Sequence, residues 1–467
     1  MSRADAINLA YLVTIVTFVL ALRFLSSPTT ARLGNWLGAA GMAIALGATF
    51  AQRGLHNHVW IIVVMAVSAP IGAVAARAVK MTAMPQMVAL FNGVGGGAAA
   101  LIALAEFHKQ APEPGRMAFN VGLSTILSAL IGSISFAGSL VAFAKLQELV
   151  SGRPIVYPAQ QVGNALLLLA ATGVGVAILA GPERDALLVG VICGAAIFGV
   201  LFVLPIGGAD MPVVISLLNA LTGLAAAATG FVLHNNVLIV SGALVGASGT
   251  LLTLLMGRAM NRSIANVLFG AFGQLAAGPA GAAAAAGMDG GTVRSAGADD
   301  VAVMLGYAKR VVIVPGYGMA VAQAQHNVRE LADELEKRGV DVRYAIHPVA
   351  GRMPGHMNVL LAEANVPYPQ LHEMDDINPH FPRTDVALVI GANDVTNPAA
   401  RNTPGSPIYG MPILDVDHAK AIVVLKRSMN PGFAGIDNEL YVDPKTVMLF
   451  GDAKDSVVKL VAGIKAL

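Results

Sequence analysis

Long apolar stretches separated by short polar ones dominate the first 260 residues of the chain. A helix needs roughly 20 apolar residues to cross about 30 Å of hydrocarbon. Nine runs are near this length, and they cover residues 6–25, 33–52, 59–79, 87–107, 121–146, 165–181, 186–208, 211–233 and 236–260. Arg23 and Phe24 stand at the end of the first run, where a signal peptide would carry small residues. The pattern therefore predicts a transmembrane domain of about nine retained helices over residues 1–260.

The hydrophobic pattern changes in the last third of the chain. A short apolar strand is predicted at 310–314, an amphipathic helix at 320–338 ending at Gly339, and a second strand at 340–346. Further strands at 385–390, 421–425 and 446–450 precede a closing helix. This alternation predicts a Rossmann-like α/β domain with a parallel sheet over residues 301–467. Residues 261–300, rich in Ala and Gly, are predicted to form a flexible linker, partly helical where Ala dominates.

Composition and charge support this division. The chain is 55% hydrophobic and 12% charged, whereas soluble domains are about 25% charged. Residues 1–300 carry only 24 of the 58 charges. These values exclude a disordered chain, a coiled coil and a nucleic-acid-binding module. The single cysteine, Cys193, excludes a disulfide framework and a cysteine zinc site, and no metal site is predicted.

The charged residues between the apolar runs predict an orientation. Nine spans place the two ends of the domain on opposite sides of the membrane. Eight Lys and Arg residues lie in loops on the side of the C-terminus, and five lie on the other side. Because cytoplasmic loops are enriched in Lys and Arg, the C-terminal domain is predicted to be cytoplasmic and the N-terminus periplasmic.

Glycines and isolated polar residues stand out within the spans. Gly93–Gly97 and Gly242–Gly246 indicate close helix packing. Polar side chains in a membrane are costly and often functional, and the candidates are Asn92, Ser139, Asp210 and Asn219. Two interpretations stay open. Asp210 either caps a helix or serves in transport, and Asn92 and Asn219 either bond neighbouring helices or serve in transport.

The turn after the first predicted strand has a dinucleotide-binding pattern. It reads Gly316-Tyr317-Gly318-Met-Ala-Val321, in which the last glycine of the usual fingerprint is absent. The second strand ends Ala345-Ile346-His347-Pro348, without the acid that bonds the ribose of NAD. Arg352 and the run Lys426-Arg427-Ser428 could instead bind a 2′-phosphate. The residues favour NADP over NAD, although Lys426 and Arg427 could equally be a solvated strand end.

Other loops fall where the strands of a parallel sheet would bind a ligand. They include Gly391–Val395 and Gly451–Lys454. The segment Met429–Gly435 has the hinge residues of a lid, or is an ordinary surface loop. There is no phosphate-loop motif of the ATPases.

Several runs together resemble the beta subunit of proton-translocating NAD(P) transhydrogenases. These runs are Pro315–Gln325, His347–Leu361, Gly391–Asp394, Lys426–Ser428, Gly451–Lys454, Gly207–Val214 and Gly242–Gly246. The resemblance covers essentially the whole chain. It implies hydride transfer from NADH to NADP+, coupled to proton movement into the cytoplasm across a bacterial inner membrane. It also implies that NADP(H) binds this chain, that NAD(H) binds a separate alpha subunit, present as one or two chains, and that the complex is a dimer.

The resemblance also implies roles for individual residues. Asp394 would lie near the nicotinamide and serve in coupling. The residues expected to contact NADP(H) are Gly316, Tyr317, Gly318, Val349, Ala350, Gly351, Arg352, Met353, Pro354, Gly391, Ala392, Asn393, Asp394, Val395, Gly410, Met411, Lys426, Arg427, Ser428, Met429, Asn430, Pro431, Gly432, Phe433, Asp452 and Ala453. Asn92, Ser139, Asp210 and Asn219 would line or gate the proton path.

Two positions depart from the family pattern. Phe433 stands where some members have Tyr, and Asn92 stands where some have a proton-carrying His. Either water together with Asn92 conducts the protons, or a titratable group on the helices of the alpha subunit carries them. Two other hypotheses stay open, a channel or carrier regulated by a nucleotide-sensing domain and a membrane-anchored NADP reductase. A companion chain with an NAD-type fold would favour the transhydrogenase.

Overall fold

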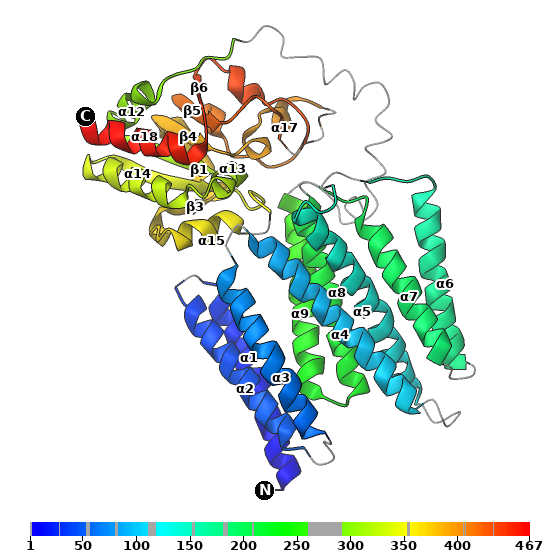
Figure 1. Ribbon diagram of the computed structural model, residues 1–467. Helices are drawn as coiled ribbons and strands as arrows, with labels where there is room; N and C mark the ends of the chain where they lie inside the picture. The colour runs from blue at the N-terminus through cyan, green and yellow to red at the C-terminus, as the bar shows by residue number, and fades with distance from the viewer. Residues whose placement is uncertain are drawn as a thin grey trace. The chain divides into compact units, whose positions relative to one another are not determined.

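The computed structural model describes residues 2–27, 29–52, 57–79, 83–110, 118–151, 155–180, 185–207, 210–259, 292–352, 355–404, 406, 408–432 and 434–467. These residues form two compact units, one of long helices and one that contains a parallel sheet (Figure 1). Within these ranges, nine helices are long and apolar enough to cross a membrane. They are α1 (Arg3–Leu25), α2 (Ala31–Phe50), α3 (His58–Ala78), α4 (Met84–Gln110), α5 (Phe119–Leu146), α6 (Gln160–Ala180), α7 (Asp185–Val203), α8 (Met211–Val232) and α9 (Asn236–Ala259). The predicted fold class is confirmed.

Two of the helices differ from their predicted bounds by five residues at one end. The helix α6 begins at Gln160 rather than 165, because polar residues before 165 extend it and pack within the fold. The Tyr157 hydroxyl donates to Asn164 Oδ1 at 2.7 Å, and Gln160 is buried. The helix α7 ends at Val203 rather than 208, since Pro205 disfavours helical backbone at the residue before it.

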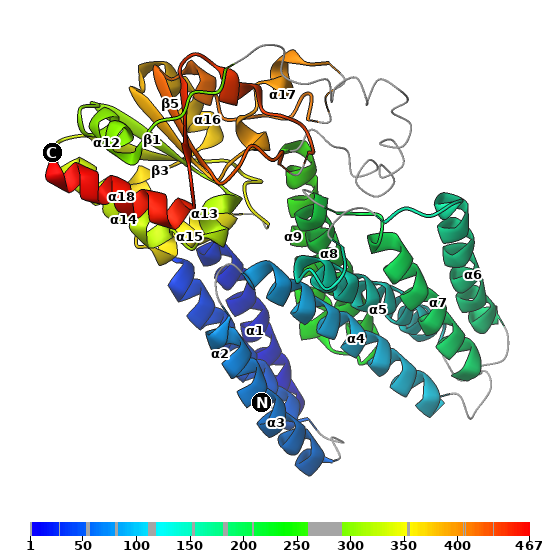
Figure 2. The same ribbon diagram turned by 45° about the horizontal axis from the view of Figure 1, so that its top comes forward.

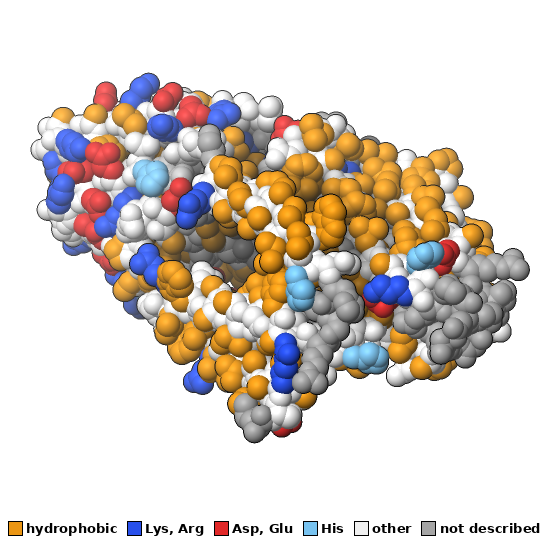
Figure 3. Space-filling view, turned by 60° about the horizontal axis from the view of Figure 1, so that its bottom comes forward, with side chains coloured by type: hydrophobic (Ala, Val, Ile, Leu, Met, Phe, Trp, Pro, Cys, Tyr) orange, Lys and Arg blue, Asp and Glu red, His pale blue; other side chains and the backbone are white. Residues whose placement is uncertain are grey.

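Glycines let the helices pack backbone against backbone. A Cβ on Gly96 of α4 would lie 2.8 Å from the Gly132 carbonyl oxygen of α5. A Cβ on Gly242 of α9 would lie 2.4 Å from the Ala227 backbone nitrogen of α8. The outward side chains are apolar, and Val59 and Trp60 of α3 are 72% and 70% exposed. Figure 3 shows such hydrophobic side chains covering much of the helical surface, as expected where lipid replaces water.

The second unit contains a six-stranded, fully parallel sheet of order β3-β2-β1-β4-β5-β6. Its strands are β1 (Arg310–Pro315), β2 (Asp341–Ile346), β3 (Leu371–Glu373), β4 (Val386–Ile390), β5 (Ala421–Lys426) and β6 (Thr446–Phe450). The helices α14 (Gln325–Lys337) and α18 (Ala453–Ala466) pack side by side along the sheet (Figure 2). A hydrophobic core that includes Phe381 and Leu440 also packs on the sheet, against strand residues such as Val312, Val389 and Val424. Apolar layers against the strands explain their nearly continuous apolar runs.

Two features of this domain differ from the prediction. The single helix predicted at 320–338 is two helices, α13 (Tyr317–Val321) and α14, because Gln323 adopts a left-handed φ of 51°. The three-residue strand β3 is too short to show a periodicity. Gly339 has a φ of 83° and ends α14 as predicted.

The predicted linker also differs at its end. Residues 260–291, most of that linker, lie outside the described residues. The Met448 N–H donates to the Arg294 carbonyl at 2.7 Å, and the Ala296 N–H donates to the Met448 carbonyl at 3.1 Å. The helix α12 (Ala298–Gly306) then packs on α18. The chain therefore joins the sheet domain near Arg294 rather than at 301, and this short bridge covers part of the β6 edge.

Candidate functional site

A cleft of about 500 Å³ lies in the sheet domain, where the parallel strands end. Its walls are the loops that follow β1, β2, β4, β5 and β6, together with Met411. Parallel sheets bind their ligands at this carboxyl edge. The volume is within the usual range of about 300–1,000 Å³ for small-molecule sites.

The turns after β1 and β4 interlock at the base of the cleft. A Cβ on Gly316 would lie 2.3 Å from the Ala392 nitrogen, and one on Gly391 would lie 2.4 Å from Gly318 Cα. The Gly318 N–H donates to the Gly391 carbonyl at 3.0 Å. Glycine is needed here because the two turns touch each other. Val321, at the position of the missing third glycine, is 48% exposed and lines the cleft, so a side chain is tolerated there.

We expect Gly316→Ala to destabilise the sheet domain. The added methyl would overlap backbone atoms that cannot rotate away, and overpacking of this kind costs about 1–3 kcal/mol or more. Gly297→Ala is the matched control, because φ is −73° there and a Cβ would meet nothing closer than 3.5 Å. Calorimetric melting of both variants measures the difference. Equal melting temperatures would show that the turns are not in tight contact.

The strand β2 ends in a buried histidine instead of an acid. His347 is 1% exposed, its Nε2 lies 2.8 Å from the Pro412 carbonyl oxygen, and its Nδ1 accepts from the Val349 N–H at 3.2 Å. Nearby, His356 Nδ1 accepts from the Arg352 N–H at 3.0 Å, and Arg352 stacks 4.5 Å above the Tyr317 ring. Both imidazoles therefore hold backbone of the loop that lines the cleft.

Because these two histidines are buried, the free energy of unfolding should depend on pH. It lowers the pKa of both His347 and His356 from 6.5 to about 4. The unfolded chain binds these protons below about pH 6.5, whereas the folded chain does so only near pH 4. The free energy of unfolding should thus be unaffected above pH 6.5 and fall between pH 6.5 and 4, by roughly 3 kcal/mol per histidine. Calorimetry should show a smaller fall in His347→Asn than in the wild type, and parallel curves would contradict the assignment.

Two cations follow β5 at the cleft. Lys426 Nζ donates to the Asn430 carbonyl at 2.6 Å and lies 4.6 Å from the centre of the Tyr441 ring. Burial lowers the pKa of Lys426, and Asp394 and Asp437 oppose this effect. Arg427 pairs with Asp452, the N-cap of α18, at 2.7 Å. Burial alone would raise the pKa of Asp452, but its hydrogen bonds with the Lys454 N–H and Arg427 hold it below the usual range.

Asp394 holds the segment that follows Lys426. Its Oδ2 accepts from the Ala434 N–H at 3.0 Å. Gly432 lies so close that a Cβ there would be 2.5 Å from Asp394 Oδ1. Behind this contact, the Tyr441 hydroxyl and the Asn393 amide are 2.8 Å apart. The loop after β4 therefore anchors the Met429–Gly435 segment against the cleft.

Comparison with known proteins identifies the family. A family model described as "NAD(P) transhydrogenase beta subunit" matches residues 7–463. The chain is 50% identical over 463 residues to the NAD(P) transhydrogenase subunit beta of Rhodospirillum rubrum, with 97% of each chain covered. The same subunit from a strain of that species gives the same values. The chain belongs to the NAD(P) transhydrogenase beta subunit family.

The resemblance predicted from the sequence is thereby confirmed. As a member of the transhydrogenase beta family, the chain is a membrane protein with a Rossmann-like domain. Family membership implies transhydrogenase activity, the binding of nicotinamide nucleotide and an alpha subunit as partner.

Most residues predicted from the beta-subunit resemblance to bind the cofactor do line the cleft. Those on its wall are Gly316, Tyr317, Gly318, Val349, Ala350, Gly351, Gly391, Ala392, Asn393, Asp394, Val395, Met411, Lys426, Arg427, Asn430, Pro431, Gly432 and Ala453. Arg352, Gly410, Ser428, Met429 and Asp452 are not on the wall. Met429 packs on the core instead, and Gly410 donates to the Ala400 carbonyl at 2.8 Å. Met353, Pro354 and Phe433 lie outside the described residues.

Sequence reasoning missed some residues of the cleft. Val321 and Leu425 also line it, beside Gly451 of the predicted Gly451–Lys454 loop, and Tyr441 and Asn438 support its floor. Leu425 ends a predicted strand and Gly451 follows one, so their positions in the sequence indicated the edge of the sheet where the cleft lies. Tyr441 and Asn438 have only long-range partners, which no local pattern shows.

In the membrane domain of this beta-family chain, two predicted residues meet. The Asn92 amide of α4 donates to Ser139 Oγ of α5 at 3.1 Å, and both residues are buried. Asn92 Oδ1 is buried without a hydrogen-bond partner among the described residues. Thr222 of α8, which was not predicted, donates to the Asn92 carbonyl at 3.3 Å. Asn219 lies half-buried on α8, and Asp210 lies just before that helix.

Proposed function

We propose that this chain binds NADP(H) in the cleft and forms much of the proton path of a transhydrogenase. The complex would transfer hydride from NADH to NADP+ as protons move inward. Residues 1–260 would be the membrane part, 261–300 the linker, whose end lies on the sheet from Arg294 onward, and 301–467 the nucleotide domain. One observation carries the cofactor assignment. The cleft brings Lys426 and Arg427 to a sheet edge whose β2 end has no acid.

The residues of the cleft fit a phosphorylated dinucleotide. Arg427 is exposed enough to reach a phosphate, with 62% of its side chain accessible, and its Asp452 partner sits at the N-terminus of α18. Gly318 and Gly391, both half-buried, place backbone at the base of the cleft for close approach of a ligand. Tyr317 and Val349 supply apolar surface. Lys426, Arg427 and Ser428 would hold the 2′-phosphate, and the Met429–Gly435 segment would cover the bound nucleotide.

The chain's own part in the reaction is orientation and exclusion of water. When bound, the nicotinamide supplies the hydride chemistry. Asp394 would hold the covering segment through the Ala434 N–H and lie beside the reacting ring. Correct placement of the two rings requires no nucleophile from this chain.

Proton conduction would pass the buried pair Asn92 and Ser139. Asn92 Oδ1, which has no partner in the described part of the chain, supports this proposal, because a buried polar atom in a membrane needs a water or a partner group. Asn92 cannot itself carry a proton at neutral pH. Water with Asn92, or a titrating group on helices of the alpha subunit, would complete the path with Asp210 and Asn219.

We expect Asn92→Ala to reduce proton-coupled turnover by about tenfold or more, with NADPH binding unchanged. Asn164→Ala is the matched control, because Asn164 is also a membrane-helix amide but bonds locally to Tyr157. Hydride transfer and pH change in vesicles containing the complex measure the effect. A reduction as large in the control would contradict a specific role for Asn92.

Location and partners follow from the same proposal. The chain would lie in a bacterial inner membrane with its N-terminus periplasmic and the nucleotide domain cytoplasmic. It would act with one or two alpha chains that bind NAD(H), in a dimer of the complex. Redox state or occupancy of the cleft would shift the nucleotide domain and change proton access near Asn92.

The complex reconstituted in lipid vesicles tests the proposed function. Vesicles containing both subunits should reduce NADP+ with NADH and show a pH change coupled to that reaction. Neither subunit alone should do so. Hydride transfer without a pH change would support a membrane-anchored reductase instead.

A further inference from the structure

His347 connects two walls of the cleft that are more than sixty residues apart in the sequence. On one side it bonds the N–H of Val349, which lines the cleft. On the other side it bonds the carbonyl of Pro412, the residue after Met411, which also lines the cleft. With 1% exposure, the ring is shielded from water that could replace either bond.

The chemistry of these partners fixes the state of the ring. A carbonyl oxygen only accepts, so Nε2 carries the proton and donates to Pro412. A backbone N–H only donates, so Nδ1 is the bare acceptor for Val349. The neutral Nε2–H form is the one form that satisfies both contacts at once.

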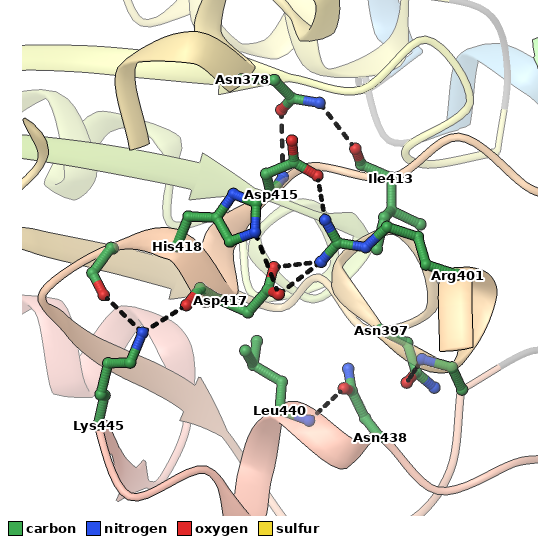
Figure 4. Close-up of polar contacts among 12 residues, drawn as sticks. Asn378, Asn397, Arg401, Ile413, Asp415, Asp417, His418, Asn438, Leu440 and Lys445 are labelled. Atoms are coloured by element: carbon green, nitrogen blue, oxygen red, sulfur yellow. Dashed lines mark hydrogen bonds and ion pairs between the residues drawn. The ribbon is translucent and has the colours of Figure 1, made fainter. Parts of the chain in front are cut away.

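The Pro412 side of this bridge is itself firmly held (Figure 4). The Asn378 amide donates to the Ile413 carbonyl at 3.0 Å, and its Oδ1 accepts from the Asp415 N–H at 3.1 Å. Arg401 then pairs with Asp415 at 2.8 Å and with Asp417 Oδ1 at 2.6 Å. The segment after Met411 is thus bonded at almost every residue, and it can serve as a fixed support.

The loop on the other side needs such a support. Gly351 has a φ of 109°, and this part of the loop is held by the side chain of His356, through Arg352 N–H. Val349, at the start of the loop, is half-buried. Its backbone N–H is the group that His347 holds.

We propose that His347 is a positioning residue, which sets the distance between the Val349–Gly351 wall and the Met411 wall of the cleft. The inference rests on the proposed function for its consequence, a cleft width matched to NADP(H). It explains why the end of β2 carries a buried histidine where an NAD site would have an exposed acid.

Two substitutions separate the two bonds of the ring. An asparagine carbonyl can replace Nδ1 as acceptor for Val349, but its amide is too short to reach Pro412. A glutamine amide can replace Nε2 as donor to Pro412, but its carbonyl is not placed to accept from Val349. His347→Asn and His347→Gln therefore each keep one half of the bridge. His372→Asn is the control, because His372 lies on the edge strand β3, next to β2 in the sheet, and does not line the cleft.

The first measurement is hydrogen exchange in the full-length chain without nucleotide. We expect faster exchange in both the Val349–Gly351 and Met411 segments for each His347 variant, and no change for His372→Asn. If the Met411 segment of the His347→Asn variant exchanges at the wild-type rate, His347 merely shapes its own turn. That result would overturn the proposal. This readout does not depend on any nucleotide.

The second measurement is NADPH affinity and steady-state kinetics of the complex with its alpha subunit. Each His347 variant should raise the Kd for NADPH and the KM for NADP+ about tenfold, with the KM for NADH unchanged. An NADPH affinity of His347→Asn equal to that of the wild type would overturn the bridging role. If the wild-type chain binds no NADPH while the exchange result holds, the proposed function fails and the positioning role of His347 in the cleft stands.

Discussion

Replacement of both Lys426 and Arg427 by alanine is expected to lower NADPH affinity by on the order of 10²-fold or more. Hydrogen bonds to charged groups contribute about 1.5–3 kcal/mol each, and about 1.4 kcal/mol is a tenfold change in affinity. Lys426 also donates to the Asn430 carbonyl of the Met429–Gly435 segment, whereas Arg427 bonds only Asp452 among the described residues. Lys426→Ala alone should therefore speed NADPH dissociation more than Arg427→Ala does.

A charge-matched control distinguishes phosphate binding from a general effect of positive charge. The double variant Lys420→Ala and Lys445→Ala removes two cations from the same domain. Lys420 pairs with Asp385, and Lys445 donates to the Asp417 carbonyl. Calorimetric titration with NADPH should give wild-type affinity for this control. An equal loss in both double variants, or no loss in either, would contradict a 2′-phosphate site at Lys426 and Arg427.

Asp394→Asn is expected to lower coupled turnover by about 10²-fold while NADPH still binds. Asparagine retains an oxygen that can accept from the Ala434 N–H, so the Met429–Gly435 segment can still be held in place. The negative charge beside Lys426 is lost, however, and the position of the segment relative to the reacting ring changes. A misplacement of about 1 Å at a reacting centre can cost 10²-fold in rate.

Asp437→Asn provides the comparison for Asp394→Asn. Asp437 is exposed and also acts on Lys426, but it does not line the cleft. NADPH titration and the rate of NADP+ reduction by NADH in vesicles separate binding from turnover. Normal coupled turnover in Asp394→Asn, or an equal defect in Asp437→Asn, would remove Asp394 from the coupling mechanism.

The parts of this structure that could be predicted from sequence are those with a local cause. A run of 20 apolar residues has one stable solution in lipid, so the nine helices and their glycine contacts followed from the pattern. Strands followed by glycine or charged loops placed most of the cleft at one sheet edge.

The parts that could not be predicted depend on distant partners. Gln323 breaks the helix after β1 although nothing in its neighbourhood is typical of a break. Gly316 is required because Ala392, which is 76 positions further on, lies against it. In the sequence, His347 showed only that the acid of an NAD site is missing at the end of β2. Its role follows from its bonds to Val349 and Pro412, which only the structure shows. Thr222 joins the pair Asn92 and Ser139 only through helix packing.

The central claim is that this chain, rather than its partner, holds NADP(H). Calorimetric titration of the purified full-length chain, without the alpha subunit, with NADPH and then NADH tests it most directly. NADPH should bind more than tenfold more tightly than NADH, a difference of more than about 1.4 kcal/mol, and the preference should be lost in the Lys426 and Arg427 double variant. Equal affinity for the two nucleotides, or tighter binding of NADH, would contradict the account.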